Sequence, residues 1–319
     1  MQRNFSPMNA AELMDSVIDV YRKSFGKQIA FAAIAHAVLL AGIFAFAIVF
    51  TFAFVLLGLT ALMDNSVTSG TVIVILVGAF TVILPIMLVW SAFTVSGHIM
   101  LSRQAFYGHS IRIEFKKIFK SIFCVITTIL AQIILFIPIV AFLCVVIYLF
   151  ATEYLWDATA YAGIIGIIAV FFLIAVGIFI FSNIFSLAVA VAVFERRHFF
   201  GAIFRSWELV KPEFWRILGI RTIWTFVAFS FSFSAQMLSA VALPALSYLD
   251  YVMPSAIVGI AGIFVMFVTN FAIPVAITLL VAPLEGILPA LIYFNRRIKS
   301  EGMDLEIRLE KLQVNPYEI

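Results

Sequence analysis

Six long apolar stretches dominate the chain, and short segments rich in polar residues separate them. Most of these stretches exceed the roughly 20 residues that a helix needs to cross the hydrocarbon core of a bilayer. Their residues do not alternate between apolar and polar, as the strands of a membrane barrel would. The pattern therefore predicts an all-α polytopic membrane helical bundle with six transmembrane helices, over residues 29–63, 71–100, 121–150, 161–194, 222–246 and 256–294.

Three of the segments outside these stretches have the spacing of amphipathic helices, with apolar and charged side chains on opposite faces. The first begins with Asn9 and Glu12, a capping-box pattern, and Gly26 is a plausible end. The second covers residues 111–120 and the third covers residues 199–210. We expect these segments to form elbow helices at the membrane surface.

Each elbow is followed by a span, a short acidic loop and a returning span, so the chain divides into three hairpin units of one plan. The units cover about residues 9–106, 107–198 and 199–298, and together they form a single membrane domain over residues 1–298. The likeness between the units is one of pattern, because few residue identities align. Residues 299–319 are expected to be a cytoplasmic tail with a helical pattern.

The basic residues give an orientation to this arrangement. All 20 Lys and Arg residues lie in the N-terminal segment, the second and fourth connections and the C-terminal tail. The other connections, residues 64–70, 151–160 and 247–255, contain none and carry acidic residues instead. By the positive-inside rule, both termini are predicted to be cytoplasmic. The first 27 residues also lack the succession of regions of a cleavable signal, so we expect the first span to be retained.

Composition agrees with a membrane protein and excludes a soluble globular domain. Hydrophobic residues make up 64% of the chain and charged residues 12%, with a mean hydropathy of +1.15 and a formal net charge of +3. The two cysteines, Cys124 and Cys144, lie within the third apolar stretch, where a disulfide framework has no context. We expect both to be reduced packing residues.

Two stretches of the chain resemble a known family. The first covers residues 190–220 and contains the triplets Arg205-Ser206-Trp207 and Phe214-Trp215-Arg216. The second, residues 291–310, contains Arg296, Arg297, Glu301, Gly302, Asp304 and Leu305. Both resemble bacterial membrane proteins similar to the membrane domain of glycerophosphoryl diester phosphodiesterases. The second stretch departs from the family pattern at one position, because Asn295 stands where the family commonly has Asp.

The resemblance implies a location rather than an activity. In such phosphodiesterases, hydrolysis belongs to a separate soluble barrel, and this chain has no room for that domain. The resemblance therefore implies a multi-pass protein of the bacterial cytoplasmic membrane that is not an enzyme. We expect it to act as a scaffold or accessory subunit in envelope or lipid-related processes. The alternative is a small-solute or lipid transporter, or the membrane subunit of one.

The transport alternative depends on polar residues inside the apolar stretches, which tend to face the interior of a bundle or a cavity. The candidate intramembrane polar site comprises Glu285, Asn270, Asn183, His36 and His98. Structural hydrogen bonding between helices is the ordinary use of such residues. An enzyme embedded in the membrane would need converging acid, base or metal groups, and this set is too sparse. We therefore expect no catalytic activity, no metal site and no cofactor.

Glu285 is the only acidic residue inside an apolar stretch, and its depth can be interpreted in two ways. A helix continuous to Phe294 would place it about 15 Å from the cytoplasmic end, near mid-membrane. However, a span that starts at Ala256 has crossed the bilayer by about residue 280. Glu285 would then lie at the cytoplasmic interface, on a segment broken at Pro283 and partly re-entrant. We favour this second geometry and expect Glu285 to be neutral or paired, either with Arg221 or with a basic residue in the elbow of another unit.

Basic and aromatic residues of the family-like stretches suit the headgroup layer of a membrane that is anionic on its cytoplasmic side. The residues expected to contact lipid headgroups or a partner are Arg205, Trp207, Trp215, Arg216, Arg296 and Arg297. The expected partners are membrane lipids with anionic headgroups, together with a protein partner or a second copy of the chain. We expect no nucleic-acid partner.

Overall fold

A computed structural model of the chain describes residues 7–64, 69–108, 110–151, 160–252 and 256–302, and these residues form helices without any strand. Six of the helical stretches are long and apolar enough to cross a membrane, which confirms the predicted number of spans. The chain is thus a multi-pass membrane protein by length and composition. The helices, in chain order, are α1 Ala10–Asp64, α2 Ser69–Tyr107, α3 Phe115–Ala151, α4 Ala160–Ile184, α5 Ser186–Glu195, α6 Phe199–Val210, η2 Lys211–Glu213, α7 Phe214–Val252, α8 Ala256–Phe267, η3 Val268–Ala272 and α9 Ile273–Glu301.

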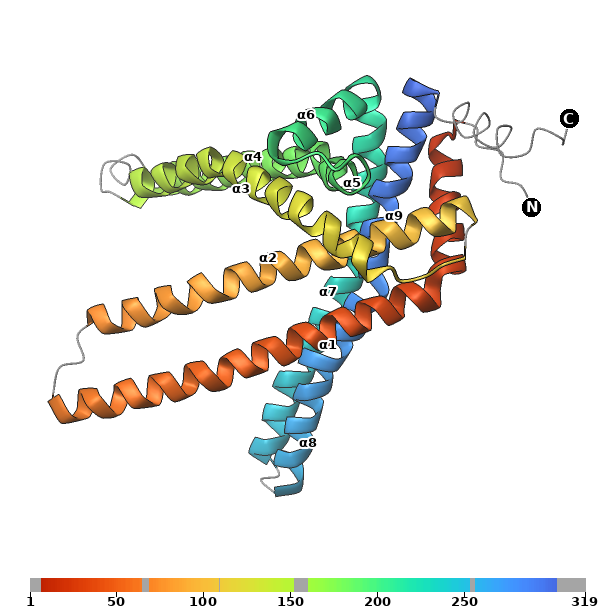
Figure 1. Cartoon of the computed structure of the whole chain (residues 1–319). Coiled ribbons are helices and arrows are strands. Elements are labelled where there is room, and N and C mark those ends of the chain that lie inside the picture. The colour runs from red at the N-terminus through yellow and green to blue at the C-terminus, as the bar shows by residue number, and fades with distance from the viewer. Residues whose placement is uncertain (1–6, 65–68, 109, 152–159, 253–255, 303–319) are drawn as a thin grey trace, which may run out of the picture.

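Three pairs of helices extend from a common junction (Figure 1). Helices α1 and α2 run side by side in one direction, α3 and α4 form a second pair, and α7 and α8 form a third that points elsewhere. The junction itself contains α5, α6, the C-terminal part of α9 and the adjoining ends of α1, α2, α3 and α7. It is therefore the place where segments distant in sequence come together.

The buried core lies at this junction. Residues 287–294 of α9 are almost completely buried and pack against small residues of α5, among them Ala190 and Ala192. Phe294 stacks on Phe106 of α2 at 5.2 Å between ring centroids. Along the paired helices, by contrast, large apolar side chains are exposed, as the lipid-facing surface of a membrane protein requires.

The N-terminal segment confirms one sequence prediction and corrects another. Asn9 and Glu12 form the predicted reciprocal capping box, because each backbone N–H donates to the other side chain at 2.9 Å. Gly26, however, does not end a helix, since α1 continues without interruption to Asp64. A glycine in a helix interior costs about 1 kcal/mol relative to alanine, which is too little to end a helix of this length.

Only one predicted elbow is a separate helix. Residues 199–210 form α6, as the pattern indicated. The first elbow is instead the N-terminal part of α1, which bends away from the rest of that helix (Figure 1). In the second, residues 110–114 are not helical and α3 begins at Phe115. The outer connection predicted at residues 247–255 also begins later, since α7 extends to Val252.

The predicted break at Pro283 is absent, because α9 is one helix across Pro283 and Pro289. Proline removes a backbone donor and weakens the hydrogen bonds of the preceding turn. The hydroxyl of Tyr21 donates to the carbonyl of Leu280 at 3.0 Å, which supplies a partner at this turn. This contact ties α9 to α1 one residue beyond Leu279, whose carbonyl loses its helical donor at Pro283.

The remaining sequence predictions have mixed outcomes. Cys124 and Cys144 are both free, as predicted, but only Cys124 is a buried packing residue. The packing role predicted for Cys144 is wrong, because its side chain is exposed on α3. The boundary predicted at residue 299 falls inside α9, which ends at Glu301 with Gly302 in a left-handed C-cap conformation. Residues 303–319 of the predicted tail lie outside the described residues.

Candidate functional site

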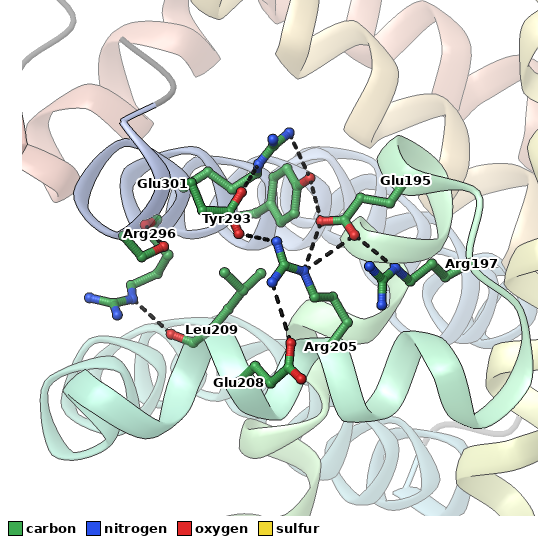
Figure 2. Close-up of polar contacts among 10 residues, drawn as sticks. Glu195, Arg197, Arg205, Glu208, Leu209, Tyr293, Arg296 and Glu301 are labelled. Atoms are coloured by element: carbon green, nitrogen blue, oxygen red, sulfur yellow. Dashed lines mark hydrogen bonds and ion pairs between the residues drawn. The ribbon is translucent and has the colours of Figure 1, made fainter. Parts of the chain in front are cut away.

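Arg205 on α6 is the centre of a group of charged residues at the junction (Figure 2). Its Nε atom lies 3.3 Å from each carboxylate oxygen of Glu195, and its Nη1 atom lies 3.3 Å from Glu208. The third nitrogen, Nη2, donates to the carboxylate of Glu301. Because these carboxylates belong to α5, α6 and α9, one guanidinium joins three helices.

Three further side chains complete this group. The hydroxyl of Tyr293 donates to Glu195 at 3.0 Å, and the Nε atom of Arg197 lies 3.0 Å from the same carboxylate. Arg297 donates to Glu301 at 2.7 Å from the preceding turn of α9. Tyr293, Arg297 and Glu301 are four residues apart in succession, so they share one face of α9.

A second carboxylate, Glu213 in η2, collects three cations. Its oxygens lie 2.8 Å from Arg296, 3.0 Å from Lys299 and 2.9 Å from Arg216. Arg296 is only 4% exposed and also donates through Nε to the carbonyl of Leu209 at 2.7 Å. This pairing fixes the turn between α6 and α7 against the end of α9.

We call the two groups together the charged layer. Its members are Glu195, Arg197, Arg205, Glu208, Glu213, Arg216, Tyr293, Arg296, Arg297, Lys299 and Glu301. Six cations face four carboxylates, and every charge has a partner of opposite sign. In the low dielectric of a protein, an ion pair persists mainly because separating it would leave a buried charge without a partner, which costs free energy. The charged layer therefore locks α5, α6, η2 and α9 in one arrangement.

The N-terminal segment is bound to this layer by its backbone. The side-chain oxygen of Asn295 accepts the N–H of Met8 at 2.9 Å, and its Nδ2 donates to the carbonyl of Met8 at 3.1 Å. Arg216 donates to the same carbonyl at 2.8 Å. Only an amide side chain can accept and donate in this way. An ionised Asp at position 295 could accept the Met8 N–H but could not donate to the Met8 carbonyl, so the two-point contact depends on the amide of Asn295.

We expect Asn295→Asp to release this segment. The carboxylate loses the donor and places a negative charge against the Met8 carbonyl, which keeps only its bond from Arg216. The lost hydrogen bond and this repulsion together cost about 1–3 kcal/mol. Hydrogen exchange of the peptide that contains Met8 should accelerate at least about tenfold, the factor that corresponds to 1.4 kcal/mol. The exposed substitution Asp15→Asn, near the start of α1, serves as the control. Unchanged protection of Met8 in Asn295→Asp would show that the contact does not hold the segment.

The residues predicted to contact headgroups fall into two classes. Arg205, Arg216, Arg296 and Arg297 are all brought together in the charged layer, where intramolecular carboxylates satisfy them. Trp207 and Trp215 are 39% and 79% exposed, and so present aromatic surface beside the layer. Sequence reasoning missed the acidic members of the layer, Glu195 and Glu213. The available signal was that Glu195 directly precedes Arg196 and Arg197, and that Glu213 lies between Lys211 and Arg216, within three residues of each.

Two of the predicted intramembrane residues, His36 and His98, lie close to one another between α1 and α2. Nδ1 of His98 lies 2.6 Å from the side-chain oxygen of Gln28, whereas Nδ1 of His36 lies 2.7 Å from the carbonyl of Ala32. The Nε2 atoms of both rings are buried without a hydrogen-bond partner. This pair is interhelical in position, which agrees with a packing use.

A second set contains Asn183 and Glu285, together with Arg221 of α7. Arg221 donates through Nε to the side-chain oxygen of Asn183 at 3.3 Å. Arg221 and Glu285 lie near enough for their charges to interact, as expected from the sequence. These three residues come from α4, α7 and α9, so the cluster depends on the packing of three helices.

Asn270 lies apart from both sets. It belongs to η3, a π-helical turn, and donates to the carbonyl of Met266 in its own helix at 3.1 Å. The five predicted residues therefore occupy three places. Among the described residues, no three His, Cys, Asp or Glu side chains are grouped as a metal ion would require.

The charged layer and the Asn183–Arg221–Glu285 cluster are thus the two candidate sites that the fold assembles. Comparison with family models, curated proteins and solved structures finds no match to this chain.

Proposed function

We propose that the chain is a non-enzymatic, multi-pass protein of the bacterial cytoplasmic membrane that acts as a scaffold or accessory subunit in envelope or lipid-related processes. In this proposal it is similar to the membrane domain of glycerophosphoryl diester phosphodiesterases, and the charged layer faces the cytoplasm. Three hairpin units then cross the membrane, and α6 lies at its surface as an elbow. The distribution of the basic residues supports this orientation.

The observation that carries the proposal is the closed pairing of the charged layer. Its acids and bases are directed at one another and at the backbone, rather than at a shared space where a substrate could react. This arrangement suits a rigid platform. The exposed aromatic rings of Trp207 and Trp215 at its edge supply the kind of residue that is enriched where proteins bind one another.

Native mass spectrometry of the chain extracted from its own membrane in mild detergent tests the proposal. We expect a second polypeptide at fixed stoichiometry. Trp215→Ser should reduce its recovery at least about tenfold, because aromatic anchors carry 2 kcal/mol or more of such interfaces. Tyr251→Ser, at an 84% exposed aromatic residue at the far end of α7, is the matched control. Recovery of the chain with no other polypeptide would contradict the accessory role.

The second candidate is a transporter that uses the Asn183–Arg221–Glu285 cluster. The observation in its favour is the presence of two opposite charges within otherwise apolar helices, where ionisable groups are usually functional. Glu285→Gln should then abolish uptake or efflux without lowering the amount of protein in the membrane. Transport that is unchanged in this variant would count against the second candidate.

A further inference from the structure

Arg221 and Glu285 lie at similar distances, measured along their helices, from the far end of the α7–α8 pair. Val252 ends α7 at the far end of its pair, and Arg221 lies 31 residues before it, or about 46 Å along a helix. Glu285 lies 29 residues after Ala256, where α8 begins, or about 44 Å. A bilayer measures about 30 Å across its hydrocarbon core and about 40–45 Å with both headgroup layers. Both charges therefore reach the headgroup layer on the side of the junction.

The face of α7 that carries Arg221 offers more hydrogen-bond donors than the protein uses. Of the five N–H groups of a guanidinium, only that of Nε has a partner among the described residues, the oxygen of Asn183. Trp224 lies three residues further on the same face, and its indole N–H is buried without a partner. Both groups can only donate, so what they lack is an acceptor.

Asn183 positions the guanidinium of Arg221 but accepts a hydrogen bond from only one of its nitrogens. The Asn183 residue is 4% exposed, and its Nδ2 atom donates to the carbonyl of Phe179 at 2.7 Å. This bond orients the side-chain oxygen toward Arg221. The two Nη groups of Arg221 thus remain available in a planar fork that matches the oxygens of a phosphate.

Glu285 carries the opposite charge but does not form a direct ion pair with Arg221. It interacts electrostatically with Arg221, yet no carboxylate oxygen lies within 4.0 Å of the guanidinium in the described structure. Its side chain is exposed on the lateral surface of α9. The two charges are therefore separated, and each keeps polar atoms for a ligand that carries both signs.

We propose that Arg221, Trp224, Asn183 and Glu285 form a binding site for a phospholipid headgroup in which a phosphate is joined to a primary amine. The Nη groups of Arg221 and the indole N–H of Trp224 donate to the phosphate oxygens, and Asn183 positions the guanidinium. The carboxylate of Glu285 accepts hydrogen bonds from the ammonium group. This site goes beyond the proposed scaffold and does not depend on any protein partner.

The depth of the site favours a lipid over a soluble molecule of the same chemistry. Phosphates of a bilayer occupy the headgroup layer, where the two charges lie, and the adjoining helix surfaces are apolar and suit acyl chains. Glu285 sets the preference among lipids. An anionic headgroup would meet repulsion from its carboxylate, and a quaternary amine has no N–H to donate to it.

Reconstitution of the full-length chain in vesicles that contain equal amounts of phosphatidylethanolamine, phosphatidylglycerol and phosphatidylcholine tests the site, with retained lipids read by native mass spectrometry. We expect the ethanolamine lipid to be enriched about fivefold over the vesicle composition, the ratio given by about 1 kcal/mol of preference. Arg221→Gln should abolish the retention of all three lipids. Glu285→Gln should keep a bound lipid but lose the preference, because only the amine contact is removed.

Arg112→Gln and Glu114→Gln, which change charges outside these helices, are the matched controls and should retain the wild-type pattern. The folding of each variant is checked by its thermal unfolding temperature before lipids are compared. Retention at the vesicle ratio in the wild-type chain, or unchanged enrichment in a folded Arg221→Gln variant, would overturn the site. Preferential retention of phosphoethanolamine over the ethanolamine lipid, when both are supplied at equal concentration, would also overturn it, since the occupant would then be the soluble molecule. A missing protein partner would leave all these results unaffected.

Discussion

Gly286→Ala is expected to separate α2 from α9 and to prevent the junction from forming. A Cβ atom at this position would lie 2.4 Å from Cβ of His98 and 3.1 Å from its backbone carbonyl carbon. These atoms belong to the body of α2, so no flexible side chain can move aside. Overpacking costs about 1–3 kcal/mol and occasionally more, and the upper end applies here because the 2.4 Å approach requires a helix to move. We expect a lower unfolding temperature and a larger aggregated fraction on size-exclusion chromatography in detergent.

Gly219→Ala is the matched control for this experiment. Gly219 lies inside α7, and a Cβ atom there would meet nothing within 4 Å. Alanine is favoured over glycine in a helix by about 1 kcal/mol, so this variant should be as stable as the wild type or slightly more stable. Equal unfolding temperatures for the two variants would show that α2 and α9 do not depend on a close approach at Gly286.

Glu213→Gln is expected to have the second largest effect, because it removes the charge that three cations share. Arg296 is buried, and without Glu213 its remaining contact is the carbonyl of Leu209. Breaking a buried ion pair from one side costs about 3–5 kcal/mol, and the lower end applies here because the Glu213 side chain is 24% exposed. The unfolding temperature should fall, and the turn between α6 and α7 should become accessible to protease.

Glu208→Gln provides the comparison on the same surface. The Glu208 side chain is 64% exposed and pairs with Arg205 at 3.3 Å, while two other carboxylates also hold that guanidinium. Exposed pairs contribute about 0–1 kcal/mol, so little change is expected. If Glu213→Gln were as stable as Glu208→Gln, the charged layer would not be what holds α6 and η2 to α9.

The sequence predicts a structural element correctly where interactions within that same segment determine it. The length of the apolar stretches is sufficient to predict the six spans, because only helices and closed barrels satisfy the backbone hydrogen bonds in lipid. The capping box of Asn9 and Glu12 is equally local, since both partners lie within one turn. The proximity of Arg221 and Glu285 was also expected, because two opposite charges in apolar helices favour each other.

Elements were mispredicted where neighbouring helices override a local tendency. Gly26 and Pro283 both weaken a helix, yet α1 and α9 continue through them. Near Pro283 the side chain of Tyr21, which is more than 250 residues away in the chain, donates to the carbonyl of Leu280 and holds this turn of α9 against α1. No pattern within one segment could indicate that contact.

The sequence by itself determined that this protein has six apolar helices and where its basic residues gather. Only the tertiary structure decided what those basic residues do. Arg205 and Arg296 had the pattern of headgroup contacts, but carboxylates from other helices bind them in the charged layer. The physical reason is that a charge is satisfied by whichever partner the packing brings to it, and the partners of α6 and α9 are separated by about a hundred residues of chain.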